Sequence, residues 1–238
     1  MRPAADFHSH ILPGVDDGSR SVEESLKMLR LLAQQGIRYV LATPHFYANH
    51  DSPERFLRRR NAAWQELSSA MRDIPGIPRV GLAAEVYYFH GISDSEVLPQ
   101  MAFPGGKYIL LEMPHSPWTE VMYREMEDIY VKWGITPVIA HVDRYIGPFR
   151  THGIPDRLAQ LPVLVQANAE FFLQRGTVRL AHQMLKKDKI HLLGSDCHNL
   201  KSRSPNIGDA LAVIENRLGQ DALHRLNSYE KMLLNMQP

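Results

Sequence analysis

The stretch Ala5-Asp6-Phe7-His8-Ser9-His10 is a short apolar run that ends in two histidines, and similar runs recur along the 238-residue chain. Between these runs lie longer segments with the apolar spacing of helices. Alternation of this kind predicts β-α-β units around a parallel sheet. We expect strands at Ala5–His8, Tyr39–Ala42, Val80–Ala84, Tyr108–Leu111, Thr136–Ala140, Val163–Ala167 and Ile190–Leu193.

Residues that cap helices mark the boundaries of the segments between the strands. Ser21-Val22-Glu23-Glu24 has the form of a capping box, and Gly36 stands where a left-handed C-terminal residue belongs. Ser52-Pro53 opens a second helix, and Gly134 closes a third that spans Thr119–Trp133. Later helices are expected at Thr177–Lys187, Pro205–Leu218 and Ser228–Asn235.

These elements make about seven β-α units, and no linker rich in proline or serine divides them. We therefore predict one α/β domain over residues 1–238, folded as a TIM-like barrel. An open, doubly wound sheet is the alternative architecture.

Bulk composition narrows the class of protein. The 27 Lys and Arg residues nearly cancel the 26 Asp and Glu residues, so the charge of the whole molecule does not argue for a nucleic-acid or membrane partner, and we expect neither. Cys197 is the only cysteine, so no internal disulfide can form and a reducing compartment fits. No apolar stretch approaches the ~18 residues needed to span a bilayer. We expect a cytoplasmic protein.

Ionisable residues follow six of the seven expected strands, at the end where each strand stops. Because the carboxyl ends of parallel barrel strands open on one face, these side chains should gather on the rim where barrel active sites form. The segments are His8-Ser9-His10, Thr43-Pro44-His45, Glu85, Glu112, His141-Val142-Asp143-Arg144 and Ser195-Asp196-Cys197-His198.

The spacing within these segments is typical of a metal site. Residues i and i+2 of an extended chain point to the same side, so His8 can share an ion with His10, and Asp196 with His198. Imidazole and carboxylate ligands together suit Zn²⁺, Mn²⁺ or Fe²⁺. Taken singly, a strand-end carboxylate is more often a helix cap, and a strand-end histidine more often a surface residue. Their joint placement favours metal binding.

Six segments together carry a resemblance to a known family. They are Asp6-Phe7-His8-Ser9-His10, Val15-Asp16-Asp17-Gly18, Ala42-Thr43-Pro44-His45, Ala84-Glu85-Val86-Tyr87-Tyr88, Ala140-His141-Val142-Asp143-Arg144-Tyr145 and Ser195-Asp196-Cys197-His198-Asn199. In this order they resemble the PHP (polymerase and histidinol phosphatase) superfamily, and most closely its bacterial capsule-locus tyrosine-protein phosphatases. The resemblance covers essentially the whole chain. It implies the PHP fold, a distorted (βα)₇ barrel, with three divalent ions that are commonly manganese.

The resemblance also implies which residues hold the ions. His8, His10, Glu85 and Asp196 would surround the first ion; Glu85, Glu112 and His141 the second, with Glu85 bridging; and Asp17, His45 and His198 the third. Asp16, beside Asp17, is the alternative carboxylate for the third ion. Arg144 and Arg203 match family positions that face the phosphate, and guanidinium groups suit paired phosphate oxygens.

The expected reaction is hydrolysis of a phosphate monoester. The charge of three divalent ions exceeds that of the four predicted carboxylates by the charge of a phosphate dianion. Such ions lower the pKa of a shared water to about 7, and the resulting hydroxide would attack phosphorus in line. By the resemblance, the substrate is phosphotyrosine on a bacterial tyrosine kinase that controls polysaccharide biosynthesis and export.

Three other functions compete with this hypothesis. Cys197 and Arg203 have the spacing of cysteine-dependent tyrosine phosphatases, but the loop between them lacks glycine, and Asp196 would raise the pKa of the thiol. A histidinol-phosphate phosphatase, or a phosphatase for another small phosphomonoester, is the alternative within the superfamily. A metal-binding adaptor of a kinase complex is the non-catalytic alternative. We expect scaffold roles for the motif-adjacent tyrosines, Tyr87, Tyr88 and Tyr145.

Overall fold

The computed structural model of the chain describes residues 2–146 and 153–234. Each pairing between its strands is parallel, and all seven expected strands are present within a residue or two of their expected bounds, together with two short strands, β3 and β5, that were not predicted. The strands are β1 (Ala5–Ser9), β2 (Tyr39–Ala42), β3 (His45–Phe46), β4 (Arg79–Leu82), β5 (Glu85–Tyr87), β6 (Tyr108–Glu112), β7 (Thr136–Ile139), β8 (Leu164–Asn168) and β9 (Leu192–Gly194).

Two positions in the barrel are occupied by pairs of short strands. Thr43-Pro44 separates β2 from β3, because its proline lacks the N–H group that a strand ladder needs. The strand expected over Val80–Ala84 ends earlier, at Leu82 of β4, and Ala83-Ala84 separates it from β5, which was not predicted. β3 and β5 then pair with each other and place His45 directly beside Glu85.

The ring of strands closes where β9 meets β1. The Asp196 N–H donates to the His8 carbonyl oxygen at 2.8 Å, and the His10 N–H donates to the Cys197 carbonyl oxygen at 2.9 Å. A parallel bridge also links Ser9 with Cys197. Over the described residues the strands therefore occupy seven positions in a closed ring. This confirms the distorted TIM-like (βα)₇ barrel and excludes the open, doubly wound sheet.

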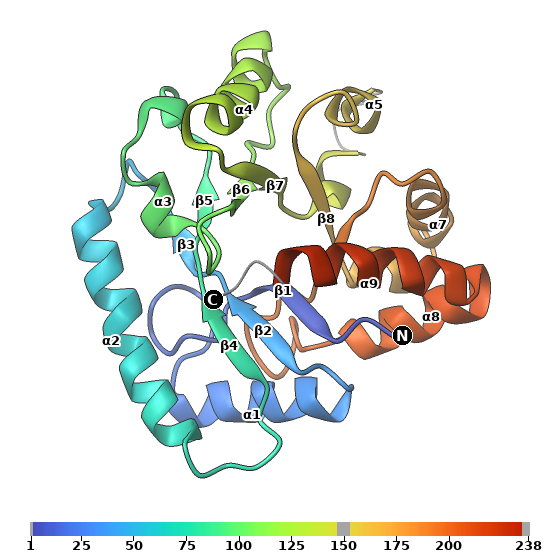
Figure 1. Cartoon of the computed structure of the whole chain (residues 1–238). Helices are drawn as coiled ribbons and strands as arrows, with labels where there is room; N and C mark the ends of the chain where they lie inside the picture. The colour runs from blue at the N-terminus through green and yellow to red at the C-terminus, as the bar shows by residue number, and fades with distance from the viewer. Residues whose placement is uncertain (1, 147–152, 235–238) are drawn as a thin grey trace.

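Most of the helices lie around the outside of this ring, and the last one lies across its amino end, where Leu233 joins a small apolar cluster that includes Phe7 (Figure 1). Among the described residues, none of the helices is both long enough and apolar enough to cross a bilayer. They are α1 (Val22–Gln34), α2 (Pro53–Met71), α3 (Leu98–Met101), α4 (Glu120–Trp133), α5 (Ile154–Leu158), α6 (Glu170–Leu173), α7 (Val178–Lys186), α8 (Ile207–Leu218) and α9 (Gln220–Leu234).

The predicted helix caps are largely confirmed. The Ser21 hydroxyl accepts from the Glu24 N–H at 3.2 Å, but the Glu24 carboxylate accepts from the N–H of Arg20 and not from that of Ser21. Only half of the predicted capping box therefore forms. Gly36 and Gly134 end α1 and α4 with φ angles of 88° and 63°, in the left-handed region that glycine tolerates.

The prediction for the last helix was wrong at its start. α9 begins at Gln220 instead of Ser228, because Gly219, with a φ of 76°, turns the chain between α8 and α9 in a single residue. The predicted end at Asn235 lies outside the described residues.

Alternate residues of the strands face two different apolar clusters. On β6, Ile109 and Leu111 belong to the larger cluster, between strands and helices, whereas Leu110 belongs to a smaller cluster that includes Phe7. Glu112 follows on the same face as Leu110, where β6 ends. The apolar face of β6 thus ends in an ionisable side chain, that of Glu112, which lies at the rim of the barrel.

Candidate metal centre

All nine predicted ligands lie together at the carboxyl edge of the barrel strands. Asp17, in the loop before α1, is the exposed member, with 67% of its side chain accessible. The others are His8 and His10 at the end of β1, His45 on β3, Glu85 on β5, Glu112 on β6, His141 after β7, and Asp196 and His198 after β9. The structure therefore gathers on one rim the side chains that strand-end placement predicts there.

Four of these residues surround one point. The Nε2 atoms of His8 and His10 are 3.1 Å apart, and both lie 3.1–3.5 Å from one oxygen of Glu85 and one of Asp196. Ligands at about 2.1 Å from a tetrahedral ion are roughly 3.4 Å from each other. The spacing of these four atoms therefore fits a shared divalent ion.

Glu85 also belongs to a second group. Its Oε1 lies 2.8 Å from Nε2 of His141, which is 3.5 Å from Oε1 of Glu112. Nδ1 of His45 approaches the same two carboxylates, at 2.9 Å from Glu85 and 3.7 Å from Glu112. Glu85 thus stands between two groups, as a bridging ligand would. The contact of His45 with the second group is one that the sequence did not predict.

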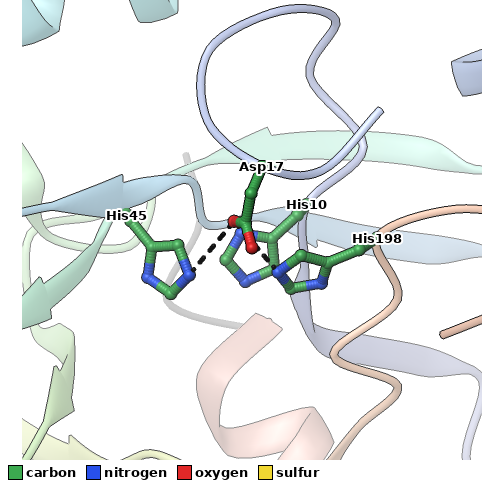
Figure 2. A group of neighbouring side chains, drawn as sticks. All are labelled: His10, Asp17, His45 and His198. Carbon is green, nitrogen blue, oxygen red and sulfur yellow. Dashed lines mark ion pairs between the residues drawn. The ribbon is translucent and has the colours of Figure 1, made fainter. Parts of the chain in front are cut away.

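Figure 2 shows the third group, in which the Asp17 carboxylate lies between two histidines from distant parts of the chain. Asp17 Oδ1 is 3.5 Å from Nε2 of His45 and 3.4 Å from Nε2 of His198. The His10 ring lies beside that of His198, with centroids 3.8 Å apart. This is the predicted third set of ligands, with His10 as an additional neighbour.

Asp16 has a different place from Asp17. Its Oδ2 accepts from Nδ1 of His10 at 2.7 Å and from the backbone N–H of His45 at 3.0 Å. A carboxylate bonded to one imidazole nitrogen orients the ring and leaves the other nitrogen free to bind a cation. The geometry therefore favours Asp17 as the ligand and Asp16 as the group that positions two histidines.

Buried atoms at the centre of the cluster lack hydrogen bonds. Among the described residues, Nδ1 of His45 and Oε2 of Glu85 are 2.9 Å apart, yet neither makes a hydrogen bond. Buried atoms of Glu112, Asp196 and His198 are likewise without a hydrogen-bond partner. Each buried polar atom without a hydrogen bond lowers the stability of the fold by about 1–3 kcal/mol. Bound cations would remove this cost, so the donor set fits divalent metal ions.

Two amides of β8 belong to the site although they were not predicted. Gln166 Oε1 lies 3.2 Å from Nδ1 of His8 and accepts the His141 N–H at 2.7 Å. Nδ2 of Asn168 donates to Oδ2 of Asp196 at 2.9 Å. A signal for both was present, because polar residues at i and i+2 interrupt an otherwise apolar strand.

Local backbone conformation places two of the ligands. Only three non-glycine residues in the described part of the chain have positive φ, and two of them are His141 (31°) and Asp196 (52°). Such conformations cost about 1–3 kcal/mol and gather at functional sites. Gly194 permits close approach, because a Cβ at this position would lie 2.4 Å from the Cβ of His8.

The charged groups shift one another's ionisation. Burial disfavours the charged form of Glu85, but the imidazoles around it, His8 first, outweigh burial and hold its pKa well below the ordinary value. Burial alone would lower the pKa of His10, yet Asp16 raises it well above its ordinary value. Burial lowers the pKa of His198 to about 4, which keeps this imidazole in the neutral form that binds metals.

Both predicted arginines lie against Asp196. Nη2 of Arg203 forms an ion pair with its Oδ1 at 2.6 Å, and Nη2 of Arg144 donates to its Oδ2. The arginine side chains are 31% and 35% exposed, so they border solvent beside the buried cluster. They line a cavity of about 380 Å³ together with Asn168 and Ser202. A phosphate on the cluster would lie within reach of both guanidinium groups.

The thiol of Cys197 cannot act as the nucleophile. The residue is completely buried. Burial first, and then the carboxylates of Asp6 and Asp196, raise the pKa of this thiol far above its ordinary value. A reactive cysteine needs the opposite shift and access to substrate. The spacing between Cys197 and Arg203 is therefore coincidental.

Two of the motif-adjacent tyrosines are part of the scaffold, as expected. The Tyr145 hydroxyl accepts the Met113 N–H at 2.9 Å, and the Tyr88 hydroxyl donates to the Glu125 carboxylate. Both rings are buried. Tyr87 differs, because it is only partly buried at the end of β5.

Comparison with known proteins extends over nearly the whole chain. The family model described as "Capsular polysaccharide synthesis, CpsB/CapC" matches residues 4–234. The tyrosine-protein phosphatase YwqE of Bacillus subtilis is 28% identical over 243 residues, which cover 98% of this chain and 92% of that protein. The tyrosine-protein phosphatase CpsB of Streptococcus pneumoniae is 29% identical over 227 residues, which cover 90% of each.

A solved structure has the same fold. It belongs to a study of YwqE from Bacillus subtilis and CpsB from Streptococcus pneumoniae, which describes them as metal-dependent tyrosine phosphatases. Its TM-score with this chain is 0.85 at 24% identity, and the match covers 98% of this chain and 95% of the other. The barrel described above is therefore an established fold.

Proposed function

The chain belongs to the CpsB/CapC family of capsular polysaccharide synthesis, and on this premise we propose that it is a metal-dependent protein tyrosine phosphatase. The chain is thus a phosphoric monoester hydrolase, like the relatives named tyrosine-protein phosphatases. The observation that carries the proposal is the cluster of predicted ligands, in which buried nitrogen and oxygen atoms converge without hydrogen bonds.

Three groups of side chains would hold three divalent ions, and we propose manganese for them. The first is His8, His10, Glu85 and Asp196; the second is Glu85, Glu112 and His141; the third is Asp17, His45 and His198. When bound, such ions supply Lewis-acid stabilisation of phosphoryl oxygens and activate a water as the nucleophile. The mixture of imidazole and carboxylate donors supports Mn²⁺, Fe²⁺ or Zn²⁺ over Ca²⁺.

The chain's own residues would bind and orient the phosphate. Arg144 and Arg203 each contact Asp196 and have further N–H groups beside the cavity that they line. Guanidinium donors fixed in this way stabilise charge that spreads over phosphoryl oxygens in the transition state. Asp196 would thus serve the ions and hold both arginines in place.

We propose a tyrosine-phosphorylated protein as the substrate, in particular a bacterial tyrosine kinase of polysaccharide biosynthesis and export. The family's description as capsular polysaccharide synthesis supports this assignment. A phenolate is a better leaving group than an alkoxide, so tyrosine phosphate needs less help from a general acid. A cytoplasmic location also remains a prediction.

Phosphate release tests the proposal. Purified protein, stripped by chelator and reloaded with manganese, should release phosphate from a phosphotyrosyl peptide much faster than from histidinol phosphate. Elemental analysis should find roughly two to three transition-metal ions per chain, as ligand sets of this kind hold. A preference for histidinol phosphate would favour the other superfamily activity, and metal binding without turnover would favour the adaptor.

A Cys197→Ser variant is the control for mechanism. Because the thiol is buried and its pKa is raised, we expect this variant to keep most of its manganese-dependent activity. A folded Cys197→Ser protein that has lost turnover by several orders of magnitude would contradict the metal mechanism.

A further inference from the structure

A second cavity borders the third ligand group and shares no described lining residue with the cavity beside the arginine pair. It has a volume of about 400 Å³, and Asp17 and His45 form the wall that it shares with the candidate metal centre. Tyr47, His50 and Arg59 contribute to the remaining walls. Its wall next to the predicted ligands includes the rings of His45 and Tyr47, whereas no aromatic residue in the described part of the chain lines the cavity beside Arg144 and Arg203.

The aromatic wall follows from strand alternation. Phe46 packs into the core against Phe56, with ring centroids 5.2 Å apart, so the residues on either side of Phe46 face the other way. His45 and Tyr47 therefore share one face, and their ring centroids are 5.2 Å apart. Tyr87 of β5 extends this surface, with its ring 5.4 Å from that of Tyr47.

Ion pairs join the lining residues near the start of α2. Arg55 Nε and Arg59 Nη1 both donate to the carboxylate of Asp51. Arg55 also donates to the His50 carbonyl oxygen at 2.8 Å, which ties the loop before α2 to the start of that helix. The cavity therefore has rings on the side of the ligands and ion-paired side chains on the side of α2.

From these observations, and resting on the proposed phosphatase function, we propose that this cavity receives the aryl group of the substrate and that Tyr47 selects aryl over alkyl phosphate esters. With the phosphate on the ligand cluster near Arg144 and Arg203, the ester oxygen would point toward His45 and Asp17. A phenyl ring attached there lies against the Tyr47 ring, where offset or edge contacts between rings are favourable. An alkyl ester reaches the same cluster but gains nothing from this wall.

The test separates binding of the ring from binding of the phosphate. Tyr47→Ala, Tyr47→Phe and the wild-type protein are loaded with manganese and titrated calorimetrically with phenylphosphonate and with methylphosphonate. Ring contacts of this kind correspond to about 3- to 10-fold in affinity. We expect Tyr47→Ala to lower the affinity for phenylphosphonate by that factor and to leave the affinity for methylphosphonate unchanged. Tyr47→Phe should keep the wild-type preference for phenylphosphonate.

Tyr130→Ala is the matched control, because this tyrosine is 46% exposed on α4 and outside the cavity. Metal content is measured for every variant, and kcat/KM on a phosphotyrosyl peptide should fall in Tyr47→Ala mainly through a higher KM. An unchanged ratio of phenyl- to methylphosphonate affinity in Tyr47→Ala, with normal wild-type turnover, overturns the inference alone. Absence of turnover of the peptide by the wild-type protein overturns the proposed function itself.

Discussion

Polar side chains are hydrogen-bonded to the strand backbone at the amino end of the barrel, whereas several buried polar atoms at the carboxyl end lack hydrogen-bond partners among the described residues. At the amino end, the Glu230 carboxylate accepts the N–H groups of Ala4 and Ala5 at 2.9 Å and 3.2 Å, and Nδ1 of His191 accepts the Val165 N–H at 2.8 Å. These side chains complete backbone hydrogen bonding where strands begin. They contribute to the stability of the fold.

At the carboxyl end, most of the predicted ligands contact one another through their side chains. Oε2 of Glu85 and Oδ1 of Asp196 are buried and have no hydrogen-bond partner in the described part of the chain. His141 and Asp196 are also held in strained backbone conformations. The fold carries these costs at the carboxyl rim, where barrel active sites form, whereas the polar groups at the amino end stabilise the backbone.

Removal of a rim ligand should have the largest effect on activity. His8→Ala or Asp196→Ala should lower kcat by about three orders of magnitude or more, because an incomplete ligand shell loses ions that stabilise the transition state. Metal content should fall in parallel, while circular dichroism should show an intact barrel. Full activity with a normal metal content in either variant would remove that residue from the site.

The arginines should affect the phosphate and not the metals. Arg144→Ala and Arg203→Ala should each cost about 2–4 kcal/mol of transition-state stabilisation, or roughly 30- to 1,000-fold in rate. Arg144→Lys should recover part of this loss, since it keeps the charge but not the fork. Elemental analysis should show unchanged metal content. Normal kinetics in both alanine variants would reduce the two residues to ion-pair partners of Asp196.

An amino-end variant should show the reverse pattern. Glu230→Ala leaves the N–H groups of Ala4 and Ala5 without their acceptor, so the free energy of unfolding should fall by about 1–3 kcal/mol. Glu230→Gln keeps an acceptor oxygen and should lose less. Denaturant titration measures the change, and kcat/KM of the folded protein should stay at the wild-type value. A large loss of kcat/KM would break the contrast between the two ends.

The smallest effect concerns His191 and depends on pH. Burial lowers the pKa of His191 below its ordinary value of 6.5, and the bond from Val165 requires a neutral ring. As the pH falls below about 6.5, the unfolded chain binds a proton that the folded chain does not, so stability decreases with acidification, by at most about 1.4 kcal/mol per pH unit. His191→Gln should flatten this part of the stability profile between pH 7 and 5. An identical slope in the variant would exclude His191 as its source.

The sequence by itself determined the alternation of strands and helices and most of the rim, whereas closure of the ring rests on contacts between β9 and β1. Strand-end placement located His8, His10 and Glu112, because side chains alternate along a strand and the carboxyl ends of parallel strands share one edge. The helix ends at Gly36 and Gly134 could also be predicted, since a left-handed residue at a helix end depends only on local backbone geometry.

Only the tertiary structure decided in which direction the ligand atoms and the aromatic rings of the rim side chains point. It distinguished Asp17 from Asp16, placed His45 between two ligand groups, and brought Gln166 beside His8. It also turned Tyr47 toward the cavity beside the predicted ligands. Sequence spacing gives the strand end at which a side chain lies. The direction of its atoms depends on loop backbone angles and on neighbours from distant strands, which no local pattern encodes.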